Sequence, residues 1–144
     1  MNRTVFIDTS GWLPLFTARE PQQAQVTEAF ARLVEERRGL ITSNLVVAEL
    51  HGLVTRRRGT GIGLALLDQL HTDPRYEVHF VDRTLETAAI DHWIRPFRDQ
   101  RFSLTDAVSF EIMRRDGIRQ AFAIDRRFSA AGFELIPGAG TDGT

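Results

Sequence analysis

The chain has 144 residues, of which 42% are hydrophobic and 26% are charged, and its formal net charge is −1. These values fit one globular domain with its own core, and they exclude a wholly disordered chain and an overall polycation. Neither Cys nor Lys occurs in the sequence, which excludes disulfides, Cys-bound zinc, thiol catalysis and a Walker A phosphate-binding loop.

Strands and helices alternate from the start of the chain. A buried strand is predicted at residues 4–7, where β-branched and aromatic residues precede a polar run that begins with Asp8. A helix is predicted from Pro21 to a C-terminal glycine at Gly39. A second short strand then covers residues 40–42.

The remaining chain continues this alternation. Helices are predicted at 45–57, with Ser43 or Asn44 as the N-cap, and at 62–71, 84–94 and 105–115, and strands at 76–81, 121–124 and 133–136. This order indicates an α/β sandwich whose parallel sheet is covered on both faces. We expect one domain over residues 1–137 and a loose glycine-rich tail over 138–144. No export signal or run of about 20 apolar residues is present, so we expect a cytoplasmic protein that does not enter a membrane.

Three aspartates occupy positions where such a fold gathers ligands. Asp8 and Asp125 each follow a predicted strand, and ligands bind at the carboxyl ends of strands in parallel sheets. Asp106 lies in the first turn of a predicted helix, three residues after Ser103. Each also has a simpler explanation, because Asp8 and Asp106 could cap helices and Asp125 could be a turn residue.

Glu49 is harder to explain as a purely structural residue. At about 100° per helical residue it points between Leu45 and Val46, in a sector where an unpaired carboxylate is costly. The structural alternatives are an ion pair with an arginine of residues 56–58 and a side chain that reaches solvent.

Convergence of these four acids would create a cation site. Carboxylates that share one pocket raise one another's pKa, and a hard divalent cation such as Mg²⁺ or Mn²⁺ relieves the repulsion. Such a metal makes water a nucleophile near neutral pH and stabilises charge on phosphoryl oxygens. The acidic pattern therefore predicts hydrolysis of phosphodiester bonds.

The segments that carry the acids resemble those of the PIN-domain ribonucleases, and specifically the VapC toxins of type II toxin–antitoxin modules. The matching segments are residues 5–10 (VFIDTS), 43–50 (SNLVVAEL), 104–110 (LTDAVSF) and 121–128 (AFAIDRRF). The resemblance implies a Rossmann-like α/β/α sandwich with a central parallel sheet. It also implies an endoribonuclease that uses Mg²⁺ or Mn²⁺ to cut tRNA, rRNA or mRNA.

Carried over residue by residue, the resemblance assigns a role to each matching position. The implied catalytic and metal-binding acids are Asp8, Glu49, Asp106 and Asp125. Ser10, in preference to Thr9, matches the hydroxyl that supports the site, because that hydroxyl must point back towards Asp8. Arg126 and Arg127 are candidate substrate contacts, and Arg127 stands where some relatives carry a further acid.

The resemblance also implies partners. A cognate antitoxin is expected to wrap the toxin and block its site, the toxin is expected to form a homodimer, and operator DNA is expected to bind only through the antitoxin.

Two other functions stay open at this point. A degenerate PIN-like module would bind RNA or a protein partner without catalysis, and metal titration by calorimetry would separate it from the nuclease. A phosphatase that uses Asp8 as its nucleophile is disfavoured, because such enzymes use a Lys that this chain lacks.

Overall fold

Five short parallel strands form one sheet in the order β3-β2-β1-β4-β5. They are described by a computed structural model that covers residues 2–17 and 22–138. The strands are β1 (Val5–Ile7), β2 (Leu40–Ser43), β3 (Tyr76–His79), β4 (Gln120–Phe122) and β5 (Glu134–Ile136). The central strand β1 pairs Val5 with Leu40 on one side and with Gln120 on the other. The predicted all-parallel sheet is confirmed.

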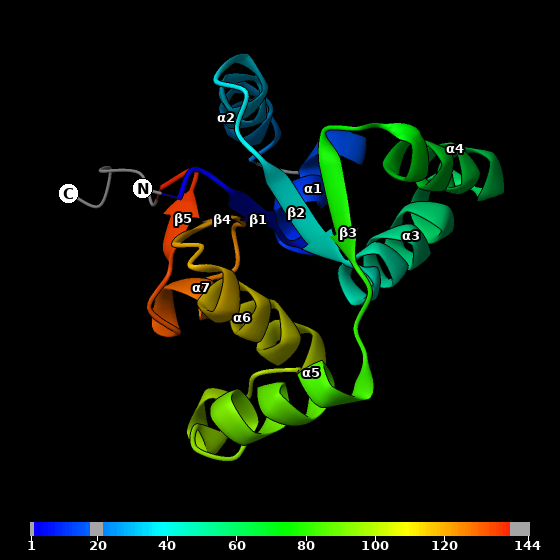
Figure 1. Ribbon diagram of the computed structural model, residues 1–144. Helices are drawn as coiled ribbons and strands as arrows, with labels where there is room; N and C mark the ends of the chain where they lie inside the picture. The colour runs from blue at the N-terminus through cyan, green and yellow to red at the C-terminus, as the bar shows by residue number, and fades with distance from the viewer. Residues whose placement is uncertain (1, 18–21, 139–144) are drawn as a thin grey trace.

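Helices cover both faces of this sheet (Figure 1). On one side lie α1 (Thr9–Phe16), α2 (Gln23–Glu35), α3 (Asn44–Arg58) and α4 (Thr60–Thr72). On the other lie α5 (Arg83–Ala89), its π-helical continuation η1 (Ile90–Ile94), the 3-10 turn η2 (Arg98–Gln100), α6 (Leu104–Asp116) and α7 (Arg127–Ala130). This division follows from right-handed crossovers, because the chain first builds outward from β1 to β3 and then returns to β4. The predicted α/β sandwich is therefore confirmed. Within the described ranges, no helix has the length and apolar character needed to cross a membrane.

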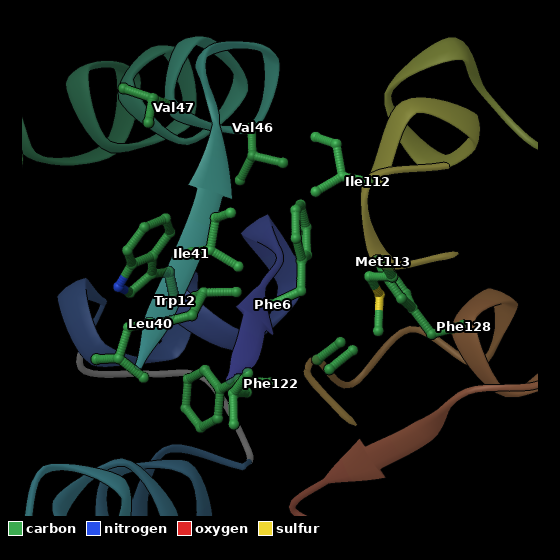
Figure 2. Packing of buried hydrophobic residues seen from close by; sticks show 14 of the residues in the cluster. Phe6, Trp12, Leu40, Ile41, Val46, Val47, Ile112, Met113, Phe122 and Phe128 are labelled. Carbon is green, nitrogen blue, oxygen red and sulfur yellow. The ribbon is translucent and has the colours of Figure 1, made fainter. Parts of the chain in front are cut away.

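The core lies between the sheet and the two helical layers (Figure 2). Every residue of β1 is fully buried, as expected for a central strand covered on both faces. Phe6 packs towards Phe128 of α7 with ring centroids 6.4 Å apart, and Trp12 of α1 packs on Tyr76 of β3 at 5.6 Å. Successive side chains along a strand point to opposite faces, so both layers contribute to one core.

Hydrogen bonds at the ends of α3 and α6 fix where these helices begin. The Ser43 hydroxyl accepts a hydrogen bond from the backbone of Val46, so Ser43 is the N-cap of α3. Ser103 caps α6 in the same way, and Gly117, with a φ of +66°, ends that helix in the left-handed conformation. Because α3 and α6 begin at the carboxyl edge of the sheet, their caps also fix where Glu49 in the second turn of α3 and Asp106 in the first turn of α6 lie.

Two short helices, α1 and α7, were not predicted. Gly11 and Pro14 lie inside α1 and are both poor helix formers, and α7 has only four residues. The predicted end of α2 was also wrong, because Arg37, with a φ of +54°, takes the left-handed position expected for Gly39. The expected start at Pro21 and most of the expected tail lie outside the described residues.

Candidate active site

Asp8 lies at the centre of the carboxyl edge of the sheet, directly after β1. It is 5% exposed, and its side chain caps α1 by accepting the backbone N–H of Ser10. Burial raises the pKa of Asp8 from 3.8 to about 6, hydrogen bonds from Ser10 lower it, and repulsion from Asp106 and Glu49 adds to the rise. The simpler explanation as a helix cap is thus realised, together with electrostatic coupling to two other acids.

Ser10 joins Asp8 to the segment that carries Asp125. Its hydroxyl donates to Oδ2 of Asp8 at 2.8 Å and accepts the backbone N–H groups of Ile124 and Asp125 at 3.0 and 3.1 Å. Thr9 differs, because its Oγ1 is buried and has no hydrogen-bond partner in the described structure. The hydroxyl that touches the acidic site is therefore that of Ser10.

Asp106 enters the site from the first turn of α6. Its carboxylate accepts the backbone N–H of Ser103 at 2.9 Å, which completes a capping box. Burial raises the pKa of Asp106, repulsion from Asp125 raises it further, and the Ser103 hydrogen bonds and the nearby Arg127 oppose the rise. Asp106 therefore acts as a structural cap while its charge is coupled to the other acids.

Asp125 lies between β4 and α7, three residues beyond the end of the strand. Its Oδ1 accepts the backbone N–H of Arg127 at 2.9 Å, and its Oδ2 accepts the Arg127 guanidinium at 3.0 Å. The same guanidinium lies 3.8 Å from Oδ2 of Asp106. Arg127 thus bridges two of the four acids.

Glu49 is exposed on α3, so of the two structural alternatives the side chain that reaches solvent is the one realised. The buried stripe of α3 runs through Val46, Leu50 and Val54, and Glu49 lies at the margin of that stripe. It forms no ion pair within the described ranges, so the arginine-pair alternative is not realised there. Its negative charge adds to the rise in the pKa of Asp8.

The four acids therefore come from separate segments and act on one another in pairs: Asp8 with Asp106, Asp8 with Glu49, and Asp106 with Asp125. Among residues 2–17 and 22–138, however, no group of three or more Asp, Glu, His or Cys side chains is arranged to hold a metal ion. The donor chemistry fits a hard cation, because every candidate ligand is a carboxylate oxygen. Oδ1 of Asp8 and Oδ1 of Asp106 also accept no hydrogen bond from the described part of the chain.

The two candidate substrate arginines point to different places. Arg127 lies against Asp125 and Asp106, as described above. Arg126 is exposed and lines a cavity of about 140 Å³ beside Gln22 and Leu135. Adjacent positions at the start of α7 therefore serve different surfaces.

A further buried carboxylate, Glu111 of α6, was missed by the sequence reasoning. It is fully buried, and it accepts hydrogen bonds from His92, Trp93, Arg114 and Arg115. Burial alone would raise the pKa of Glu111, but these donors lower it to about 2. A glutamate between Phe110 and Ile112 was the available signal, because a carboxylate flanked by core residues needs buried partners.

Comparisons with known proteins agree with this arrangement. A family model for the PIN domain matches residues 5–134. The 23S rRNA-specific endonuclease VapC20 of Mycobacterium tuberculosis is 33% identical over 129 residues, covering 90% of this chain and 95% of the relative. Ribonuclease VapC26 of the same species is 32% identical over 127 residues, covering 88% and 90%.

A solved structure extends the likeness to three dimensions. The crystal structure of M. tuberculosis VapC20, a sarcin–ricin loop cleaving toxin, matches with a TM-score of 0.78 at 33% identity. It covers 90% of this chain and 95% of that one. The fold is that of a PIN-like α/β/α sandwich. The chain belongs to the PIN-domain family and, within it, to the VapC toxins, which are endoribonucleases.

Proposed function

We propose that this chain is a Mg²⁺-dependent endoribonuclease toxin that cuts ribosomal RNA at the sarcin–ricin loop. The observation that carries the proposal is that the buried carboxylates of Asp8 and Asp106 lie at the carboxyl edge of the sheet, where burial and the charge of Asp106 raise the pKa of Asp8. Coupled carboxylates with oxygen ligands suit a hard divalent cation, with Mn²⁺ as a substitute. The choice of RNA is supported by one relative, VapC20, which is named as a 23S rRNA-specific endonuclease and whose crystal structure is described as that of a sarcin–ricin loop cleaving toxin.

In this proposal, Asp8, Glu49, Asp106 and Asp125 are the catalytic acids and would hold the cation. When bound, the cation supplies Lewis-acid chemistry, because it makes water nucleophilic near neutral pH and offsets charge at the phosphate. Ser10 holds Oδ2 of Asp8, which leaves Oδ1 for the cation. Arg126 and Arg127 are candidate contacts for the RNA backbone, since guanidinium groups bind phosphate bidentately.

The remaining expectations about partners belong to the same proposal. A VapC toxin acts with an antitoxin. We expect the antitoxin to cover the edge of the sheet where Asp8, Asp106 and Asp125 lie, which we call the acidic edge. We propose that the toxin forms a homodimer, that operator DNA binds through the antitoxin alone, and that the complex works in the cytoplasm where ribosomes are found. The single sheet also supports one PIN domain over residues 1–137.

The test uses the purified chain and two RNA hairpins, one with the sarcin–ricin loop sequence and one with the same stem and an altered loop. We expect one internal cut in the first hairpin, dependent on Mg²⁺ and abolished by EDTA, with a 5′-phosphate and a 3′-hydroxyl. Glu49→Gln should abolish the cut, whereas Glu28→Gln, which changes an exposed glutamate on α2, should not. Cleavage that survives EDTA or Glu49→Gln would refute the metal-site assignment.

Calorimetry with Mn²⁺ separates this proposal from a binding-only module. The nuclease should take up Mn²⁺ in a manner that depends on Glu49, and a degenerate module should take up none.

A further inference from the structure

Within the described ranges, Arg127 is the partner in every ion pair of Asp106 and Asp125. One guanidinium nitrogen lies 3.0 Å from Oδ2 of Asp125, and Nε lies 3.8 Å from Oδ2 of Asp106. The pair is sheltered on the acid side, because the Asp106 and Asp125 side chains are 9% and 26% exposed, while the Arg127 side chain is 50% exposed. The Arg127 side chain is therefore held at the acidic edge, but it is exposed enough to rotate away into solvent.

These contacts engage the same oxygens that a cation would need. Both oxygens of Asp125 already accept hydrogen bonds from Arg127, one from the backbone and one from the side chain. Oδ2 of Asp106 accepts the backbone N–H of Ser103 and faces Nε of Arg127. A cation that binds Asp125 through Oδ2 must first separate that oxygen from the guanidinium.

We propose that Arg127 is a positioning residue that competes with the divalent cation for the carboxylates of Asp106 and Asp125. This inference rests on the proposed function, because it assumes that these acids bind a cation. The bridge keeps Asp125 turned towards α7, in agreement with the lack of a preformed three-carboxylate group in the described structure. Cation binding then requires the guanidinium to move away, which lowers the affinity for the cation and frees a positive group beside the site.

The test is calorimetric titration of the full chain with Mn²⁺ at pH 7.5 and low salt, without RNA. Arg127→Ala and Arg127→Gln both remove the competing charge and keep the backbone hydrogen bond to Asp125. From the size of partly exposed ion pairs, we expect each to bind Mn²⁺ about three- to tenfold more tightly than the wild type. Arg127→Lys keeps the charge but loses the planar guanidinium. Its affinity for Mn²⁺ should therefore lie between that of the wild type and that of Arg127→Ala.

Arg126→Ala is the matched control for cation affinity. It removes an adjacent positive charge whose side chain lines a different cavity, so it should change the Mn²⁺ affinity by less than about twofold. In an Asp125→Asn background, the gain from Arg127→Ala should shrink, because the contested carboxylate is gone. The thermal shift caused by Mn²⁺ gives a second readout and should be larger for Arg127→Gln than for the wild type.

The outcomes separate this inference from the proposed function. If the wild type binds Mn²⁺ through Glu49 and cuts RNA, but Arg127→Ala and Arg127→Gln bind Mn²⁺ equally or more weakly, then Arg127 does not compete and this inference fails alone. If the wild type takes up no Mn²⁺ and cuts no RNA, the proposed function fails. Equal gains for Arg126→Ala and Arg127→Ala would also overturn the inference, because they would indicate a general charge effect.

Discussion

The Ser10 hydroxyl donates to Oδ2 of Asp8 at 2.8 Å while it accepts the backbone N–H groups of residues 124 and 125. A single oxygen thereby fixes the ends of β1 and β4 relative to each other across more than a hundred residues of chain. We predict that Ser10→Ala lowers the free energy of unfolding by about 1–3 kcal/mol, because it leaves both N–H groups without their acceptor. Urea denaturation measures this loss.

Thr9→Val is the matched control for Ser10→Ala. The Thr9 hydroxyl is buried without a described partner, so replacing it by a methyl group of similar size should leave stability unchanged or raise it. A similar loss in both variants would contradict the role assigned to the Ser10 hydroxyl.

The hydrogen bonds from Ser10 lower the pKa of Asp8. Ser10→Ala should therefore raise the pKa of Asp8 further.

Asp8→Asn should abolish RNA cleavage and stabilise the protein in EDTA above pH 6. Because the pKa of Asp8 is about 6 in the fold and 3.8 ordinarily, the folded protein loses stability as the pH rises from 3.8 to 6. This loss in the free energy of unfolding is at most about 3 kcal/mol. Asn also serves as an N-cap, so α1 should be preserved.

Thermal unfolding of Asp8→Asn and wild type at pH 4, 5, 6 and 7.5 tests this expectation. The two stabilities should converge at the acid end and differ by a constant amount above pH 6. A variant that is less stable than the wild type at pH 7.5 would show that the charged form of Asp8 is not penalised by the fold.

Gly11→Ala should prevent folding or destabilise the protein by about 3 kcal/mol or more. An added Cβ at Gly11 would lie 2.2 Å from the carbonyl oxygen of Phe122, which belongs to the backbone of β4 and cannot rotate away. Gly61→Ala is the control in α4, where no atom lies within 4 Å of the added Cβ. That change should stabilise the helix by up to about 1 kcal/mol. Soluble expression and urea unfolding distinguish the two; a Gly11→Ala protein of normal stability would contradict the close approach of α1 to β4.

Glu111→Gln should cost about 2–4 kcal/mol, because it leaves Arg114 and His92 without their buried anion. The pKa of Glu111 is about 2 in the fold and 4.5 ordinarily, so its stabilising effect is complete above pH 4.5 and disappears as the pH falls towards 2. The stability gap between wild type and variant should therefore narrow over that interval. Urea unfolding at pH 7, 4.5 and 2.5 measures it.

Glu28→Gln provides the comparison for an exposed pair. Glu28 pairs with Arg32 on the surface of α2, and both side chains are 69% exposed. Such a pair contributes less than about 0.5 kcal/mol. Equal losses in Glu28→Gln and Glu111→Gln would mean that burial adds nothing to the Glu111 cluster.

Local patterns in the sequence were sufficient for most of the fold. Most strands are short runs rich in apolar residues next to turn residues, and the longer helices carry apolar residues at helical spacing, so these elements could be located without the structure. The pattern was insufficient at α1. Gly11 and Pro14 have low helix propensity, but close packing against β4 favours a helix there. It was also insufficient at Arg37, which adopts a conformation that the sequence favoured for Gly39.

The sequence by itself determined the five strands and the longer helices, that the sheet is parallel, and that Asp8 and Asp125 follow strands that end at one edge. Only the tertiary structure decided the partners: Ser10 for the backbone at 124 and 125, Arg127 for Asp125 and Asp106, and four donors for Glu111. The physical reason is one of range. Helical and strand periodicity depends on residues that are close in sequence. An ion pair depends instead on which distant segments the folded sheet brings within a few ångströms.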